Sequence, residues 1–133
     1  MQNNLPVFWK SIKDSTKKYV VFKGRSSRQE YIIFTIFINL VPFFIGFFEE
    51  ILGLFPSTEY SIIGIFFSLA FFLPGFAVTI RRLHDVNRSG WWVLINLTII
   101  GIIPFAYWVC IKKSDEGENR FGNNPTIGTE IFS

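Results

Sequence analysis

The chain has 133 residues and a net charge of +3 at neutral pH, and half of its residues are hydrophobic, including 17 phenylalanines. Its 13 basic and 10 acidic residues are absent from three long runs, residues 31–48, 60–80 and 89–111. A soluble helix keeps charged residues on its outer face, so these runs exclude an ordinary soluble helical bundle and predict an integral membrane protein.

As α-helices the runs would be roughly 27, 32 and 34 Å long, against a hydrocarbon core of about 30 Å. We therefore predict an all-α integral membrane helical bundle with three transmembrane helices and a short N-terminal amphipathic interfacial helix. In this interpretation residues 1–133 form a single membrane domain with a basic cytoplasmic leader (1–30), spans near residues 31–48, 60–80 and 90–111, and a polar tail (112–133).

The leader carries seven basic residues against two acidic ones. Phe8, Ile12 and Tyr19 fall near one helical face, which predicts a short helix lying in the cytoplasmic interface with its lysines near anionic headgroups. A partly ordered leader that only sets the topology is the alternative. We predict no cleavable signal peptide, because the basic residues precede the first apolar run and no small-residue cleavage site follows it.

The start of the first span has a helix-capping signal, because Ser27 is followed three residues later by Glu30, as in a capping box. A proline in each run predicts kinked helices. The runs also hold a few polar side chains, which we interpret as hydrogen-bonding groups between helices rather than as substrate contacts. These are Thr35, Asn39, Ser61, Ser68, Thr79, Asn96 and Thr98.

The third run has two interpretations. Gly101 and Pro104 lie near its middle, where a turn would make it a re-entrant hairpin. Irregular backbone at that depth needs protein or water around it, which so small a bundle provides poorly. We therefore favour a single kinked span, which would place the tail outside.

The basic residues also predict an orientation. Residues 49–59 carry three glutamates and no basic residue, whereas residues 81–88 carry three arginines. Because basic loops stay in the cytoplasm, we expect the N-terminus and residues 81–88 to lie inside and residues 49–59 to lie outside.

Three polar motifs follow one another along the chain: F-x-G-R-x-S-R-x-E-Y from Phe22, R-R-L-H-D-x-x-R-S-G-W-W from Arg81, and G-E-N-R-F-G-x-x-P from Gly117. In this order and spacing they resemble the family called domain of unknown function 805, over nearly the whole chain. Asn87 and Asn124 stand where that family often has glycine and aspartate. The resemblance implies a small multi-span helical protein of the bacterial inner (plasma) membrane, and it implies no established activity.

The motifs have a structural and a functional interpretation. In the first, arginines stop the second span, tryptophans form an aromatic belt, and short polar residues make turns and caps. The residues of this interpretation are Ser27, Glu30, Gly90, Trp91, Trp92, Asn119, Arg120 and Gly122. In the second, charged residues converge on the cytoplasmic face to bind an anionic headgroup or an acidic partner, with pH-dependent help from the histidine. The candidate binding residues are Arg25, Arg28, Arg81, Arg82, His84, Asp85 and Arg88.

We expect no enzymatic activity, cofactor or metal site, because one histidine and one cysteine cannot supply the usual ligands and no catalytic motif is visible. The predicted function is that of a non-enzymatic membrane module that binds lipid or a partner protein. A small oligomeric transport or channel-like protein is the alternative, although charge-free spans disfavour ion coupling. The expected partners are membrane lipids, a second copy of the chain or another membrane protein, and not nucleic acid.

Overall fold

The computed structural model describes residues 6–54 and 62–125. Within these ranges the secondary structure is helical apart from one isolated bridge between Asn119 and Gly122. The expected all-α class is therefore confirmed for the described residues. The elements are α1 (Val7–Lys17), α2 (Arg28–Ile51), α3 (Ile62–Asp85), the 3-10 helix η1 (Gly90–Leu97), α4 (Ile99–Ala106) and the π-helical turn η2 (Tyr107–Ile111).

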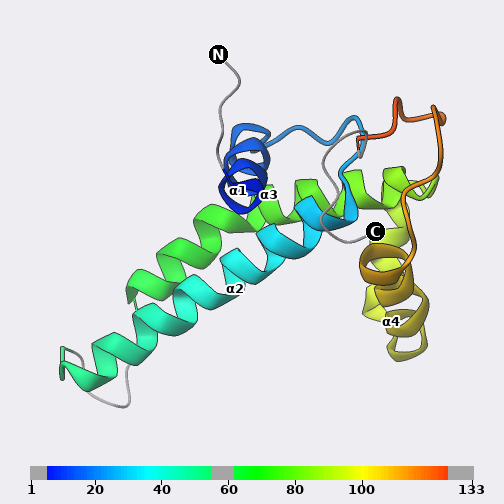
Figure 1. Ribbon diagram of the computed structural model, residues 1–133. Helices are drawn as coiled ribbons and strands as arrows, with labels where there is room; N and C mark the ends of the chain where they lie inside the picture. The colour runs from blue at the N-terminus through cyan, green and yellow to red at the C-terminus, as the bar shows by residue number, and fades with distance from the viewer. Residues whose placement is uncertain (1–5, 55–61, 126–133) are drawn as a thin grey trace.

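Helices α2 and α3 form a long antiparallel pair (Figure 1). Each has 24 residues and is long and apolar enough to cross a membrane. Many of their large apolar side chains are exposed, as expected for helices whose solvent is lipid. The helices continue through Pro42 and Pro74. Gly75 lets them approach closely, because a Cβ there would lie 2.9 Å from the Cδ1 atom of Ile38 on α2.

Residues 90–111 do not form the single kinked span that we expected. η1 leads away from the end of α3, the backbone becomes extended at Thr98 (φ −108°, ψ 137°), and α4 with η2 returns (Figure 1). Trp92 in the outgoing arm and Trp108 in the returning arm lie with ring centroids 5.3 Å apart. We call residues 90–111 the hairpin, and its two ends lie together beside the end of α3.

The hairpin turn explains why the expectation was wrong. The Thr98 hydroxyl donates to the Ile95 carbonyl at 2.8 Å and accepts from the Gly101 N–H at 3.1 Å, so a local side chain satisfies the backbone of the turn. The turn therefore does not need other helices around it to supply these hydrogen bonds. At about 2.0 Å per residue in η1 and 1.5 Å in the returning arm, the hairpin is roughly 16–20 Å long, between one half and two thirds of a bilayer core of about 30 Å.

The leader contains one helix, α1, which packs on α2 and α3. Its side chains Ser11, Ile12 and Ser15 are buried, whereas Phe8 and Trp9 are exposed. The hydroxyl of Tyr19, just after α1, donates to the carbonyl of Ala70 on α3.

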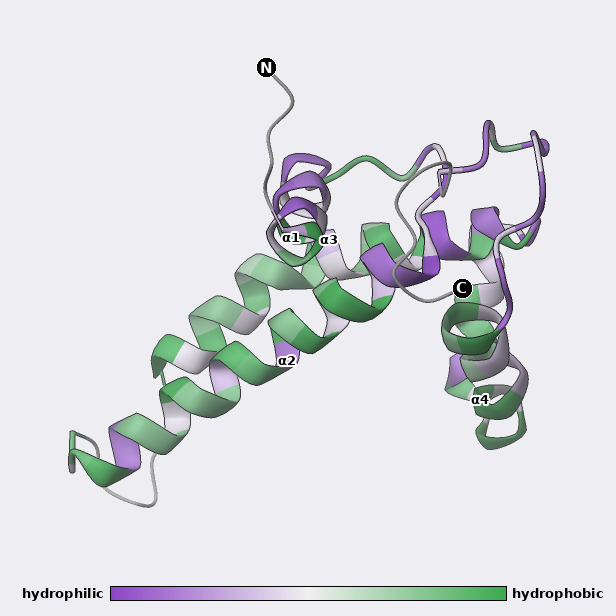
Figure 2. Ribbon diagram, in the orientation of Figure 1, coloured by the Kyte–Doolittle hydropathy of each residue, from purple (hydrophilic) through white to green (hydrophobic). Residues whose placement is uncertain are grey.

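Polar segments gather on one side of the molecule. Figure 2 shows hydrophilic residues along α1, in the loop before α2, at the end of α3 and in the segment after the hairpin, whereas the helix pair and the hairpin are largely apolar. We call residues 18–28, 81–89 and 112–125 the polar cap. The fold thus consists of an apolar helix pair and an apolar hairpin that meet at one polar cap.

Candidate functional site

Asp85, at the end of α3, is the centre of the polar cap and is fully buried. Its Oδ1 accepts from Arg25 Nε at 2.9 Å. Its Oδ2 accepts from Arg82 Nη1 and from the Ser114 hydroxyl. Its backbone carbonyl accepts from the N–H of Asp115 at 3.1 Å. One residue therefore joins the leader, α3 and the tail.

Like Asp85, Arg25 uses its polar side-chain atoms for contacts within the chain. Besides Asp85 Oδ1, its guanidinium donates to the carbonyls of Gly117 at 2.8 Å, Gly122 at 3.0 Å, Asp115 at 2.6 Å and Asp85 at 3.4 Å. A guanidinium has five N–H donors, so every one has an acceptor. Gly117 and Gly122 have positive φ angles of 69° and 124°, which glycine adopts without strain, and this lets the tail wrap around Arg25.

Arg82 joins α3 to the returning arm of the hairpin. Its side chain is fully buried, and Nε donates to the carbonyl of Val109 at 3.0 Å. Its two other nitrogens donate to Asp85 Oδ2 and to the carbonyl of Lys112. The end of the hairpin is thereby held beside the end of α3.

Arg81 joins α3 to the leader. Its Nε donates to the Ser26 hydroxyl at 2.9 Å, and Nη1 donates to the carbonyl of Val21 at 2.6 Å. Its Nη2 lies 3.4 Å from the carboxylate of Glu30, which also accepts from the Ser15 hydroxyl on α1 at 2.8 Å. We call Arg25, Glu30, Arg81, Arg82 and Asp85 the arginine cluster.

The arginine cluster contains three guanidinium groups and only two carboxylates, so positive charge is in excess. Asp85 lies beyond the charge-free run that ends at Ile80. Burial raises the pKa of its carboxyl, whereas the Ser114 hydroxyl and the guanidinium groups of Arg82 and Arg25 lower it. Removal of the carboxylate would leave two guanidinium groups in a dry site without a counter-charge.

The structure therefore brings together four of the seven candidate binding residues, Arg25, Arg81, Arg82 and Asp85, but turns them inward. All four are buried, and their polar atoms bond to one another and to backbone carbonyls. Their geometry is that of a structural core between chain segments. Arg28 also contacts the chain, through a 3.3 Å hydrogen bond to the carbonyl of Ile111.

Two of the candidate binding residues lie nearer the surface. The guanidinium of Arg88 stacks over Trp92 and Trp108, 5.5 and 4.7 Å from their ring centroids, and so covers both ends of the hairpin. His84 stacks on Phe121 at 3.9 Å between ring centroids.

The residues interpreted as structural hold the polar cap together. Ser27 caps α2 by accepting from the Glu30 N–H at 3.2 Å, although the Glu30 carboxylate contacts Ser15 and Arg81. Asn119 donates to the carbonyl of His84 at 2.9 Å, and Arg120 donates to the carbonyl of Asn87 at 3.2 Å. The motif that begins at Gly117 is thus in direct contact with the motif that begins at Arg81.

Three of the residues interpreted as structural, Gly90, Trp91 and Trp92, lie at the start of η1 rather than within the polar cap. A Cβ on Gly90 would lie 2.8 Å from Ile80 Cγ2, so glycine allows η1 to begin close against α3. Trp91 is 79% exposed, and Trp92 packs on Trp108, which fits side chains at the edge of an apolar layer.

A groove opens beside this start of η1, with a volume of about 370 Å³. We call it the interfacial groove. Its polar lining comes from Lys23, His84 and Ser89, and its apolar lining includes Phe22, Phe76, Ile80, Trp91, Val93 and Leu94. Polar groups of the cap and apolar groups of the helices therefore meet in one concave site.

The tautomer of His84 follows from its contact. Its Nδ1 lies 3.1 Å from the carbonyl of Gly24, and since a carbonyl only accepts, Nδ1 carries the hydrogen and Nε2 is left as an acceptor. Burial lowers the pKa of His84, opposed by this hydrogen bond, so the ring is neutral at pH 7.

Sequence reasoning missed several residues of the polar cap. Lys23 occupies a variable position of the first motif, and nothing in the sequence distinguishes it from the other lysines of the leader. Ser114, Asp115 and Gly117 contribute a hydroxyl or backbone carbonyls, and such contacts depend on how the tail folds rather than on a residue pattern.

Comparison with protein-family models finds a match to "Protein of unknown function (DUF805)" over residues 19–123. The chain belongs to the DUF805 family. The matched range contains the whole arginine cluster and the hairpin, so the contacts described above lie inside the DUF805 domain.

Two curated relatives from Escherichia coli K12 are inner membrane proteins by name. The chain is 37% identical to the inner membrane protein YhaH over 116 residues, which cover 84% of this chain and 92% of YhaH. It is 38% identical to the inner membrane protein YhaI over 118 residues, which cover 85% and 92%. No solved structure matches the chain. Together with the long apolar helices, these relatives support an inner-membrane location for this DUF805 protein.

Proposed function

We propose that the protein is a non-enzymatic inner-membrane module that binds an anionic phospholipid at the cytoplasmic surface. The observation that carries this proposal is the lining of the interfacial groove, which combines a lysine, a histidine and a serine with apolar side chains. A phospholipid has the same division between a polar head and an apolar chain.

The polar side of the interfacial groove can bind a lipid headgroup that contains a phosphate and a hydroxyl group. Lys23 is exposed and makes no ion pair within the described part of the chain, so its ammonium group is available to a phosphate oxygen. The free Nε2 of neutral His84 accepts from a hydroxyl group, and the Ser89 hydroxyl lies on the same rim. Phosphatidylglycerol offers both partners, whereas phosphatidylcholine offers no net charge and no head hydroxyl.

The remainder of the groove suits the start of an acyl chain. Phe76, Ile80 and Leu94 line it from α3 and η1, and its volume is within the usual range of ligand pockets. The exposed lysines of α1, Lys10, Lys13 and Lys17, would raise the local concentration of anionic lipid, at about 1 kcal/mol for each lysine near the surface.

Replacing Lys23 with alanine is expected to weaken binding of phosphatidylglycerol about tenfold, or ~1.4 kcal/mol, because a charge-assisted hydrogen bond is lost. Native mass spectrometry of the full chain from lipid nanodiscs, titrated with phosphatidylglycerol and separately with phosphatidylcholine, measures the difference. Lys13→Ala removes the same charge from α1 outside the groove and is the matched control, with an expected loss below about twofold. Equal losses in the two variants, or equal binding of the two lipids, would refute a site in the groove.

We also propose a topology of two crossings and one re-entrant hairpin, in place of three crossings. Hydrogen bonds that link residues 18–26, 81–85 and 109–117 support it, because segments so joined lie on one side of the membrane. The length of the hairpin, roughly one half to two thirds of the bilayer core, is too short to cross it and supports this topology as well. The basic leader then places this common side, with the N-terminus and the tail, in the cytoplasm.

A C-terminal alkaline phosphatase fusion is expected to be inactive, and a C-terminal green fluorescent protein fusion is expected to fluoresce. The reason is that phosphatase folds only outside the cytoplasm. A phosphatase fusion after Leu54, between α2 and α3, is the matched control and is expected to be active. An active C-terminal phosphatase fusion would contradict the proposed hairpin.

A further inference from the structure

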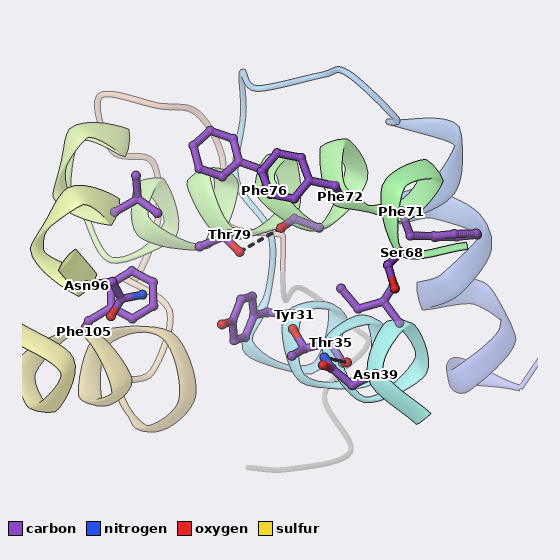
Figure 3. Close-up of a pocket in the computed structure, with 13 residues that line it drawn as sticks. Tyr31, Thr35, Asn39, Ser68, Phe71, Phe72, Phe76, Thr79, Asn96 and Phe105 are labelled. Atoms are coloured by element: carbon purple, nitrogen blue, oxygen red, sulfur yellow. Dashed lines mark hydrogen bonds between the residues drawn. The ribbon is translucent and has the colours of Figure 1, made fainter. Parts of the chain in front are cut away.

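A second cavity, also of about 370 Å³, lies deeper, between the helix pair and the hairpin (Figure 3). We call it the membrane cleft. It is lined from α2, α3, η1 and α4, all within the charge-free runs. Asn39, Ser68 and Asn96 on its walls are exposed, so the cleft opens at the apolar surface of the molecule.

The walls of the membrane cleft are unusually polar for a membrane interior. Six residues with hydroxyl or amide groups line it: Tyr31, Thr35, Asn39, Ser68, Thr79 and Asn96. The three from α2 are spaced four residues apart and so form one stripe along the helix. Five of the seven polar residues expected to bond between helices thus face a shared open space. Of the other two, Thr98 caps the hairpin turn, and Ser61 lies outside the described residues.

Several of these groups are hydrogen-bonded within the protein, and the Tyr31 hydroxyl bonds to the side chains of Thr35 and Thr79. The Asn39 amide donates to the carbonyl of Thr35 at 2.7 Å, and the Thr79 hydroxyl donates to the carbonyl of Gly75 at 2.8 Å, each within its own helix. The Asn96 amide makes no hydrogen bond within the described part of the chain. Figure 3 shows the Tyr31 hydroxyl and the Asn96 amide directed toward the cleft from opposite sides. An unpaired amide in hydrocarbon is costly, so Asn96 favours an occupant that pairs with it, and the Tyr31 hydroxyl lies where it can contact the same occupant.

The chemistry of the walls restricts that occupant. All six polar liners are uncharged, so an ionised head would enter a dry site without a counter-charge. Hydroxyl and amide groups instead match carbonyl and hydroxyl oxygens. Phe71, Phe72, Phe76 and Phe105 supply flat apolar walls, against which a planar head or an apolar chain can pack.

We propose that the membrane cleft binds an uncharged amphiphile taken from the bilayer, with carbonyl or hydroxyl oxygens in its head and an apolar chain. Membrane quinones and diacylglycerols both have this chemistry. The membrane cleft adjoins the interfacial groove, since Phe76 and Val93 line both, but no polar liner is common to the two cavities.

The test uses the full chain in phosphatidylcholine nanodiscs, titrated with a short-chain menaquinone and separately with dioctanoylglycerol, with bound ligand measured by native mass spectrometry. We expect saturable binding of at least one probe at one molecule per chain. Binding of the quinone alone, of the glyceride alone or of both supports the site and identifies the source of the ligand. Binding of neither probe would overturn the proposal.

Two variants locate the binding. Tyr31→Phe and Asn96→Leu are each expected to weaken it about tenfold, because each removes a hydrogen-bonding group from the cleft. Tyr107→Phe makes the same change as Tyr31→Phe, at an exposed residue of η2 that does not line the cleft, and is expected to leave binding unchanged. Lys23→Ala is also expected to have no effect, which separates this site from the interfacial groove. Undiminished binding in both Tyr31→Phe and Asn96→Leu would overturn the proposal.

Discussion

Asp85→Asn is expected to lower the free energy of unfolding by about 3–5 kcal/mol, the usual cost of removing one partner from a buried ion pair. Asparagine has nearly the same shape and keeps one oxygen acceptor, so the main loss is the negative charge between Arg25 and Arg82. Both guanidinium groups are sealed from solvent, and water cannot replace the carboxylate. Thermal unfolding of the purified protein in detergent, followed by tryptophan fluorescence, measures the effect.

Asp115→Asn is the matched control for this change. The Asp115 carboxylate lies 3.3 Å from Lys112 Nζ, and both side chains are partly exposed, at 28% and 36%. An exposed ion pair contributes about 0–1 kcal/mol, so the control should unfold within a few degrees of the parent protein. If the two variants lowered the unfolding temperature equally, the central role of Asp85 would be wrong.

Gly101→Ala is expected to destabilise the hairpin by at least about 1–3 kcal/mol, the typical cost of forcing extra volume into a packed site. A Cβ at this position would lie 2.1 Å from the carbonyl oxygen of Ile95 and 2.6 Å from the Thr98 hydroxyl, so backbone would have to move. The turn that reverses the chain could then not keep its two hydrogen bonds. Thermal unfolding and the fluorescence of Trp92 and Trp108, which bring the arms together, report the change.

Gly46→Ala provides the comparison, because it is the same substitution within α2 at a position where, apart from the adjacent residues and the backbone of the helix itself, no described atom lies within 4 Å of the new Cβ. Alanine is favoured over glycine in a helix by about 0.5–1 kcal/mol, so this variant should be as stable as the parent protein or slightly more stable. Similar unfolding temperatures for the two variants would show that the hairpin turn tolerates a side chain.

The two long helices were predictable because hydrocarbon imposes a simple requirement, the absence of charge over a bilayer's thickness, and residues 31–48 and 60–80 meet it. Residues 89–111 meet the same requirement and still fold differently. Hydropathy records that a segment is apolar and not whether its backbone reverses. The reversal depends on Thr98 and Gly101 acting together, and only Gly101 was recognised in advance.

The arginines illustrate a second limit. Positive charge beside a span predicts which side of the membrane a segment occupies, but not the direction in which a guanidinium points. For Arg25 that direction is set by carbonyl groups of Asp115, Gly117 and Gly122, some 90 residues away in sequence. Every residue has a carbonyl, so no pattern of side chains indicates which carbonyls will gather there.

The contacts of Arg25 also have a consequence for biosynthesis. Arg25 and Asp85 are 60 residues apart, and the carbonyls of Gly117 and Gly122 come from a segment that is synthesised after all the helices described above. Until that segment has been made, the guanidinium lacks most of its acceptors and the tail cannot cover it. The nascent protein would therefore expose an incompletely bonded cation at the membrane surface until residues 115–122 have been synthesised. A chain truncated before residue 112 would remain in that state, with a feature by which quality-control proteases could distinguish it from the finished protein.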